Sequence, residues 1–240
     1  MKASDRAPCG QPPVTLQHLS VHYRKACALQ DVSGHFAWGS LTAVVGRNGS
    51  GKSTLLKSIA GRLPAHAVCS AQGVQLALPL QKMAYLAQRS ELDPRFPISV
   101  LDCTLQGYWQ RIGAFGRITA DMQASARDAL HTVGLPGAGP HRLEALSVGQ
   151  LQRVLFARLL LQDAELILLD EPFSAVDAQT TEDLLALLQL WQQQGRTVIA
   201  VLHDAQQVER YFSHTLVLDG KAVSWGERTP TQGMALQVAA

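Results

Sequence analysis

Residues 46–54 read Gly46-Arg47-Asn48-Gly49-Ser50-Gly51-Lys52-Ser53-Thr54, and this stretch decides the fold of the chain. It follows an apolar run, Leu41 to Val45, and precedes a segment with helical periodicity, Leu55 to Ala60. A strand, a glycine-rich turn and a helix start in that order are what a phosphate-binding loop requires. The glycines allow a tight turn with inward N–H groups, and the helix start adds free donors and partial positive charge. The stretch therefore predicts a site for the phosphates of a nucleotide.

Two side chains of this loop carry chemistry. Lys52 would reach the β- and γ-phosphates, and the hydroxyl of Ser53 would ligate Mg²⁺. A glycine-rich turn that binds nothing is the alternative, and the complete G-x-x-x-x-G-K-S pattern between a strand and a helix argues against it. We therefore expect the nucleotide to contact the whole stretch, namely Gly46, Arg47, Asn48, Gly49, Ser50, Gly51, Lys52, Ser53 and Thr54.

The composition is that of a folded globular protein. The 240 residues are 47% hydrophobic and 17% charged, which is enough for one sizeable core or a core plus a subdomain. A net charge of +2 gives no argument for nucleic acid or another polyanion as partner. The four cysteines are far apart and show no C-x-x-C, so we expect reduced thiols in a cytosolic protein. Residues 1–13 are expected to be a flexible segment without a secretory signal.

A second chemical motif follows the apolar run Leu166 to Leu169. Four apolar residues predict a buried parallel strand, and Asp170 and Glu171 stand at its carboxyl end. Ligands bind beyond that end in open α/β sheets. We expect Asp170 to hold Mg²⁺ through water and Glu171 to polarise an attacking water. A strand that ends in solvated acids is the alternative.

The remaining pattern predicts an α/β protein with a helical insertion. Two closely joined strands, 14–23 and 28–36, cannot be parallel with helical crossovers, so an antiparallel sheet leads into the nucleotide core. Little strand signal appears between Gln88 and about Leu161, where helices are expected at 100–109, 120–133 and 147–161. Further strands are expected at 73–77, 82–86, 197–202, 215–218 and 222–225, and further helices at 178–194 and 204–211.

The run Leu146 to Gln150, taken together with Leu166 to Glu171, resembles the ATPase subunit of an ATP-binding cassette (ABC) transporter. The resemblance covers nearly the whole chain, and the phosphate loop alone would be shared by many nucleotidases. It implies an α/β fold with a P-loop NTPase core of the RecA-like kind, an N-terminal antiparallel β subdomain and an inserted α-helical subdomain. The expected domain is a single ABC ATPase unit at 14–240, with the helical subdomain at about 89–162.

The resemblance also implies individual roles. Tyr23 is similar to the family's adenine-stacking aromatic residue, and Gln88 to the glutamine that senses Mg²⁺ and faces the permease. Glu171 looks like the catalytic glutamate and His203 like the switch histidine, with Lys52 as the third catalytic residue. The implied cofactors are ATP and Mg²⁺, and the implied Mg²⁺ ligands are Ser53, Gln88 and Asp170.

A second anion site is expected at the helix that starts near Ser147, where free N–H groups and a positive dipole end meet Gly149. The helical insertion separates this helix from the phosphate loop, so we expect one chain not to direct both at the same phosphate. The run Leu146 to Gln150 is similar to the signature of the family. A two-fold dimer solves the problem, because each chain presents its signature to the phosphate loop of the other. The residues expected to contact the partner's nucleotide are Ser147, Gly149, Gln150 and Asp177.

Two residues depart from the family pattern. Arg47 stands where the family often has proline, and we expect little effect because that position mostly shapes the loop. Val148 stands where the family usually has glycine in the signature. A side chain there could crowd the nucleotide of the opposite subunit. Because Ser147 and Gly149 remain, we expect lowered efficiency at most and not loss of function.

The subfamily signal lies in loop sequences. Arg95 to Val100, Gln106-Gly107 and Arg111 to Arg117 look like the ATPases of manganese and zinc importers, as does His203-Asp204 followed by Tyr211-Phe212. No physical argument from these residues points to a metal ligand, because the transported ion would never touch this subunit. ATPases of iron–siderophore or haem uptake are similar and remain the nearest alternative.

The resemblance implies a location at the cytoplasmic face of the inner membrane, as a peripheral subunit. The implied partners are a second copy of the chain, integral-membrane permease subunits and, indirectly, an extracytoplasmic solute-binding protein, with no nucleic acid. Two other classes of protein share the phosphate loop. A soluble ABC-type ATPase of DNA repair or translation usually has long coiled-coil insertions or two cassettes, and a small-molecule kinase would not need the signature.

Overall fold

A computed structural model describes residues 11–24, 26–70, 73–88, 97–113 and 116–227. The first ten residues of the segment expected to be flexible lie outside the described residues. The same holds for 89–96, which includes Arg95 and Phe96 of the subfamily signal, and for 228–240 at the end of the expected domain.

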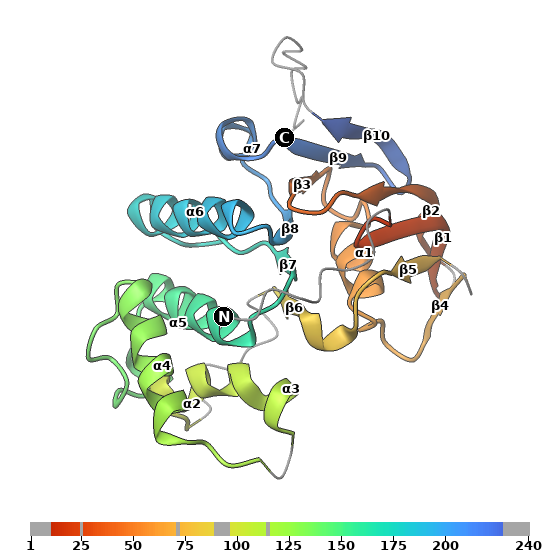
Figure 1. Cartoon of the computed structure of the whole chain (residues 1–240). Coiled ribbons are helices and arrows are strands. Elements are labelled where there is room, and N and C mark those ends of the chain that lie inside the picture. Colours follow the sequence, from red (N-terminus) through yellow and green to blue (C-terminus); the bar gives the residue numbers. More distant parts are fainter. Residues whose placement is uncertain (1–10, 25, 71–72, 89–96, 114–115, 228–240) are drawn as a thin grey trace.

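A six-stranded sheet forms the centre of the molecule (Figure 1). Strands β9-β3-β8-β7-β6 run parallel in that order, and β10 pairs antiparallel with β9 at one edge. Every residue of β3, β7 and β8 is buried, as the apolar runs predicted for strands covered on both faces. The bounds are β3 Leu41–Val45, β6 Met83–Leu86, β7 Leu166–Asp170, β8 Thr197–Val201, β9 His214–Leu218 and β10 Ala222–Glu227.

The two faces of this sheet pack against two apolar cores. Alternate residues of a strand point to opposite faces, so Ala43 and Val45 of β3 belong to one core and Val44 to the other. The first core extends into the helical part of the chain, and the second lies beneath helix α1 (Lys52–Ile59) and the second sheet. Burial on both faces fixes the position of the strands whose carboxyl ends carry the chemical motifs.

The second sheet is antiparallel and is built around β1 (Val14–Tyr23). Strand β2 (Ala26–Phe36) pairs along one side of β1, while β4 (Ala67–Cys69) and β5 (Val74–Leu76) pair with different halves of its other side. The expected antiparallel sheet is therefore confirmed. Strand β4 was not predicted, because it has three residues and is defined by its pairing with the end of β1.

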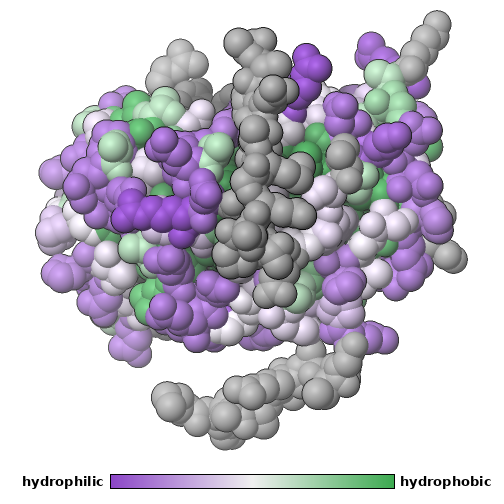
Figure 2. All heavy atoms as spheres, turned by 90° about the horizontal axis from the view of Figure 1, so that it is seen from above, coloured by the Kyte–Doolittle hydropathy of each residue, from purple (hydrophilic) through white to green (hydrophobic). Residues whose placement is uncertain are grey.

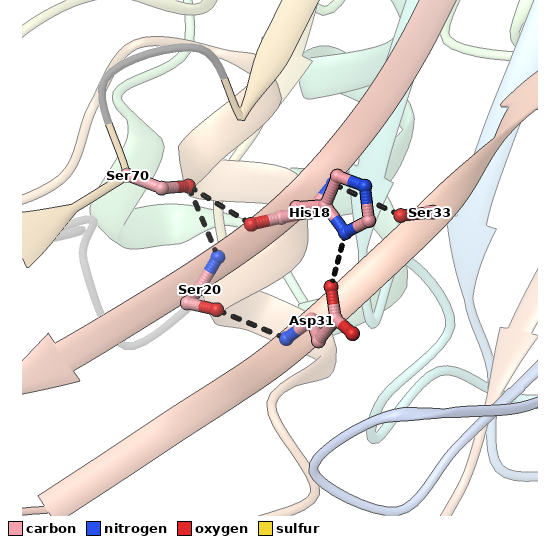
Figure 3. Close-up of polar contacts among 5 residues, drawn as sticks. All are labelled: His18, Ser20, Asp31, Ser33 and Ser70. Atoms are coloured by element: carbon pink, nitrogen blue, oxygen red, sulfur yellow. Dashed lines mark hydrogen bonds and ion pairs between the residues drawn. The ribbon is translucent and has the colours of Figure 1, made fainter.

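An irregularity on β1 and β2 is stabilised by side chains (Figure 3). His18 and Asp31 both adopt positive φ, and His18 Nδ1 lies 2.6 Å from Asp31 Oδ1. The hydroxyl of Ser33 accepts from the backbone N–H of His18, and that of Ser20 accepts from the N–H of Asp31. Side-chain acceptors thus replace ladder hydrogen bonds where the register shifts, as at a pair of bulges.

The helical part lies beyond β6, where α2, α3, α4 and α5 gather at the lower left of Figure 1. The helical stretch expected at 100–109 is confirmed, but it is not one regular helix, because a 3₁₀ turn, Gln106–Tyr108, separates α2 from α3. Gly107 lies so close to α5 that a Cβ atom there would be 2.4 Å from the carbonyl oxygen of Arg158. The bounds are α2 Val100–Leu105, α3 Trp109–Ile112, α4 Ala120–Thr132 and α5 Val148–Gln162.

Two further helices, α6 (Ala178–Gln193) and α7 (Ala205–Tyr211), cover the other side of the central sheet from α1 (Figure 1). On the face shown in Figure 2, hydrophilic residues are widespread among the described atoms and apolar residues form small separate groups. Within the described part of the chain, no helix combines the length and the apolar character that a membrane crossing needs.

Candidate nucleotide site

The loop between β3 and α1 needs glycine at two positions. Gly46 has φ +151°, and a Cβ atom there would lie 2.1 Å from the carbonyl oxygen of Leu218. Gly51 has φ +95° and is the N-cap residue of α1, and its Cβ would lie 2.5 Å from the carbonyl oxygen of Ala28. Both positions combine a left-handed conformation with a close backbone approach. The loop is thus wedged between β9 and β2, with its N–H groups at the start of α1.

Lys52 is buried within this loop. Its Nζ donates to the carbonyl oxygens of Gly46 at 2.8 Å and Arg47 at 2.9 Å. Burial lowers the pKa of Lys52, and the nearby carboxylates of Glu171 and Asp170 counteract part of that effect. The ammonium group is therefore held at the loop by groups that leave it able to contact an anion.

A cavity of about 580 Å³ opens beside the loop. Tyr23 at the end of β1 lies on its rim with its ring 5.9 Å from that of His66, and Ala28 of β2 lies beside it. Neither His66 nor Ala28 was predicted as a neighbour of the site, since their contribution depends on how the two sheets meet. The lining residues are Tyr23, Ala28, Asn48, Gly49, Gly51, Lys52, Ser53, Thr54, Gln88, Glu171 and His203.

Ser53 and Asp170 come together behind the cavity. The hydroxyl of Ser53 donates to Asp170 Oδ1 at 2.9 Å, and Asp170 is 1% exposed. Tyr85 of β6, which was not predicted, places its hydroxyl 3.5 Å from Asp170 Oδ2. A hydroxyl and a carboxylate side by side are oxygen ligands that suit Mg²⁺. The described residues contain no group of three or more His, Cys, Asp or Glu able to hold a metal.

Glu171 is held from two sides. His203 Nε2 lies 2.8 Å from Glu171 Oε1, and Gln88 Nε2 donates to Glu171 Oε2 at 3.1 Å. The backbone of Glu171 has φ +50°, a conformation that non-glycine residues adopt rarely and that often marks functional sites. Strands β6, β7 and β8 are neighbours in the sheet, so the three side chains meet just beyond their carboxyl ends.

Four residues expected at a nucleotide lie outside the lining of this cavity, namely Ser147, Gly149, Gln150 and Asp177. Ser147 caps α5 and forms a reciprocal capping box with Gln150. A Cβ atom at Gly149 would lie 2.9 Å from Asp177 Oδ2, so the starts of α5 and α6 are in close contact. Arg153 of α5 strengthens that contact through Asp183 Oδ2 of α6 at 2.7 Å.

Of the loop residues predicted to contact nucleotide, three do not line the cavity, namely Gly46, Arg47 and Ser50. Arg47 is exposed, whereas Ser50 is buried and its Oγ has no hydrogen-bond partner within the described structure. These three residues therefore belong to the turn itself and not to the wall of the cavity. The backbone of Ser50 also stabilises the turn: its N–H donates to the carbonyl oxygen of Arg47, and its carbonyl oxygen accepts from the N–H of Gly220.

The geometry can be compared with known proteins. The model of the ABC transporter family matches residues 29–174, which is more than half of the chain. The chain belongs to the ABC transporter family. This ABC cassette therefore binds nucleotide and is an ATPase, and the expected α/β P-loop fold is confirmed.

Relatives and solved structures agree with this family. The cassette is 40% identical to the manganese transport system ATP-binding protein MntB of Listeria monocytogenes, over 90% of this chain and 92% of the relative. It is 38% identical to the zinc transport system ATP-binding protein TroB of Treponema pallidum, over 89% of this chain and 80% of the relative. The expected likeness to manganese and zinc systems is confirmed.

Two solved structures are similar throughout. One is an ABC transporter assigned to the metal-chelate type in an inward-facing conformation, with a TM-score of 0.78, 30% identity and coverage of 90% of this chain and 84% of that one. The other is the dimeric ATP-binding cassette MJ0796 in a post-hydrolysis state bound to ADP and Pi. Its TM-score is 0.74 at 26% identity, over 90% of this chain and 99% of that one.

Proposed function

We propose that this chain is the ATP-hydrolysing subunit of an ABC importer that takes up zinc or manganese through a separate permease. The observation that carries the chemical part is the convergence of Lys52, Glu171 and His203 on one cavity beside the phosphate loop. The identity of the transported metal is inferred from the relatives, because ATP-binding proteins of manganese and zinc systems match about nine-tenths of the chain at 37–40% identity.

Hydrolysis follows from what each side chain can do. Lys52 binds the β- and γ-phosphates as a charged donor, and the N–H groups at the start of α1 bind the remaining phosphate oxygens. Glu171 accepts a proton from the attacking water and orients it. His203 and Gln88 each hold one carboxylate oxygen of Glu171 and so fix its direction. Tyr23 stacks on the adenine at the far end of the cavity.

Mg²⁺ fits the residues at the back of the cavity. Ser53 and Asp170 would hold the ion, with Gln88 beside them. The ion would neutralise negative charge on the phosphate oxygens. The chain's own contribution is to keep the hydroxyl of Ser53 2.9 Å from the carboxylate of Asp170, which is itself buried.

Each nucleotide site is completed by a second copy of the chain. Ser147, Gly149 and Gln150 lie at the start of α5, which does not line the cavity of its own chain. The capping box occupies the N–H groups of Ser147 and Gln150, so the N–H of Gly149 is the one we assign to an anion among these three residues. Asp177 lies against Gly149, so both would reach the partner together. A two-fold dimer buries both helix starts against two nucleotides, and a structural relative is itself dimeric.

The remaining partners follow from the same proposal. Permease subunits bind the chain near Gln88 and the helical part, where the indole of Trp109 is 60% exposed. An extracytoplasmic solute-binding protein takes part indirectly, and the chain is peripheral at the cytoplasmic face of the membrane. Residues 14–240 act as one ABC ATPase domain with the helical subdomain at about 89–162.

The growth of cells that lack this chain tests which substrate is transported. Cells that lack this chain should grow poorly when zinc or manganese is scarce and recover when either is added. Expression of the wild-type chain should restore growth and Glu171→Gln should not, which ties the phenotype to hydrolysis. The chain should also co-purify with membranes, which a soluble ABC-type ATPase would not do.

Iron–chelate or haem uptake is the second candidate, and the structural likeness to a transporter assigned to the metal-chelate type favours it. Growth of the deletion strain that responds to haem or an iron chelate, and not to zinc or manganese, would replace the leading proposal with this one.

A further inference from the structure

His203 is connected to the rest of the chain through a short helix. It stands two residues beyond β8 and directly before Asp204, the N-cap residue of α7. Asp204 Oδ1 accepts from the N–H groups of Gln206 at 2.8 Å and Gln207 at 3.2 Å. Because the cap joins His203 to the first turn of α7, the orientation of this helix sets the direction in which the imidazole points.

The side of α7 that faces α6 is not filled by apolar side chains. A cavity of about 400 Å³ lies there, bounded by the loop after Glu171, by α6 and by α7. Phe173, Thr181 and Gln207 are among its lining residues. Val208 and Phe212 anchor α7 to the core on its other side. Packing alone therefore leaves the distance between α6 and α7 poorly determined.

One carboxylate spans this gap. Glu182 of α6 accepts a hydrogen bond from the phenol of Tyr211, and its other oxygen lies 3.4 Å from Arg210 Nη1. The guanidinium of Arg210 lies over the ring of Tyr211, 5.1 Å from its centre. We call these contacts of Glu182 with the last turn of α7 the Glu182 bridge.

The two contacts of the Glu182 bridge differ in strength. Arg210 and Glu182 are 70% and 46% exposed, and an ion pair at such a surface contributes little. A phenol that donates to a charged carboxylate is the stronger interaction. The hydrogen bond to Glu182 also raises the pKa of Tyr211, as expected for a phenol that donates to a carboxylate.

We infer that Glu182 and Tyr211 are positioning residues for hydrolysis: they hold α7 against α6 so that His203 stays in contact with Glu171. This inference rests on the proposed function, because it takes the pair of His203 and Glu171 as part of the hydrolytic site. It adds a connection between the start of α6, where Asp177 contacts Gly149, and the histidine at the cavity.

The test uses the purified full-length chain and steady-state ATP hydrolysis. Tyr211→Phe removes the donor, and Glu182→Met removes the acceptor while keeping the length of the side chain. Each should lower kcat about three- to tenfold, which corresponds to the loss of one hydrogen bond, with KM for ATP unchanged and the melting temperature lowered by no more than about 2–4 °C. Asp128→Asn, which removes a carboxylate charge on α4, should leave kcat unchanged. The two substitutions together should cost no more than either alone.

The His203→Ala background decides through which residue the bridge acts. There, Tyr211→Phe should have no further effect on kcat. Wild-type kcat in both bridge variants would overturn the inference and leave the proposed function intact. An undiminished loss in the His203→Ala background would also overturn it, because the bridge would then act elsewhere. Wild-type kcat in His203→Ala itself would overturn the role of His203 in the proposed function and the bridge with it.

Discussion

His203 Nε2 lies 2.8 Å from Glu171 Oε1, although 32 positions of sequence separate the two residues. The sheet explains the contact, because Asp170 and Val201 are paired neighbours on parallel strands β7 and β8. Glu171 stands one residue beyond that pair and His203 two beyond it. Both therefore emerge at the carboxyl edge of the sheet, where the phosphate loop also begins.

The role of Glu171 predicts a separation of binding from hydrolysis. Glu171→Gln keeps the size of the side chain and its contacts with Gln88 and His203, but removes the base. ATP affinity should stay close to that of the wild type, while turnover falls by about 10²–10⁴-fold. Equilibrium binding of a fluorescent ATP analogue and phosphate release measure the two quantities. Turnover near that of the wild type would refute the assignment.

Stacking on the adenine predicts a graded response at Tyr23. Tyr23→Ala should weaken ATP binding by about 1–3 kcal/mol, the usual contribution of stacking between a base and an aromatic side chain. Tyr23→Phe and Tyr23→Trp keep a ring at the end of β1 and should bind like the wild type. Equal losses in the alanine and phenylalanine variants would make Tyr23 a structural residue and not an adenine contact.

Burial of Lys52 predicts how ATP affinity depends on pH. The pKa of Lys52 lies below its ordinary value of 10.5, chiefly because of burial. Phosphates favour the charged ammonium, so affinity is complete below the pKa of the free chain and falls as pH rises through it. The decline in ATP affinity should therefore begin at a pH below that at which a lysine ordinarily loses its proton. Lys52→Ala should bind weakly and show no such decline, and a wild-type affinity that stays flat up to pH ~10.4 would contradict the role.

The parts of the fold that the sequence predicted well are those in which local pattern and tertiary burial agree. Strand β7 is an unbroken apolar run with both faces covered, and its two acids stand where the sheet ends. The loop at Gly46 and Gly51 combines glycine with close backbone approaches, so its pattern is tied to its geometry. Such positions are constrained by more than one physical requirement at once.

The parts that could not be predicted depend on contacts between distant segments. The helical stretch expected at 100–109 contains a 3₁₀ turn at Gly107, where α5 lies against it. The sequence of residues 100–109 alone does not show that α5 is their neighbour. Tyr85 reaches Asp170 from the adjacent strand, which requires the strand order of the sheet. The approach of Gly149 to Asp177 within one chain likewise follows from the packing of α5 beside α6.

The central claim is that each ATP site is formed by two chains, and a disulfide tests it most directly. Asn48 lines the cavity, and Val148 begins α5 in the signature. Chains with Asn48→Cys and chains with Val148→Cys are prepared separately, each with Glu171→Gln to retain ATP and with Cys9, Cys27 and Cys69 replaced by serine. Cys103 is buried and can stay.

The mixture of the two variants, oxidised with ATP and Mg²⁺, should give a covalent dimer that neither variant gives alone and that ADP does not support. A chain that carries both cysteines should give the same dimer. Failure to crosslink in the mixture, with ATP-dependent dimers present by light scattering, would contradict the claim that the signature of one chain faces the phosphate loop of the other.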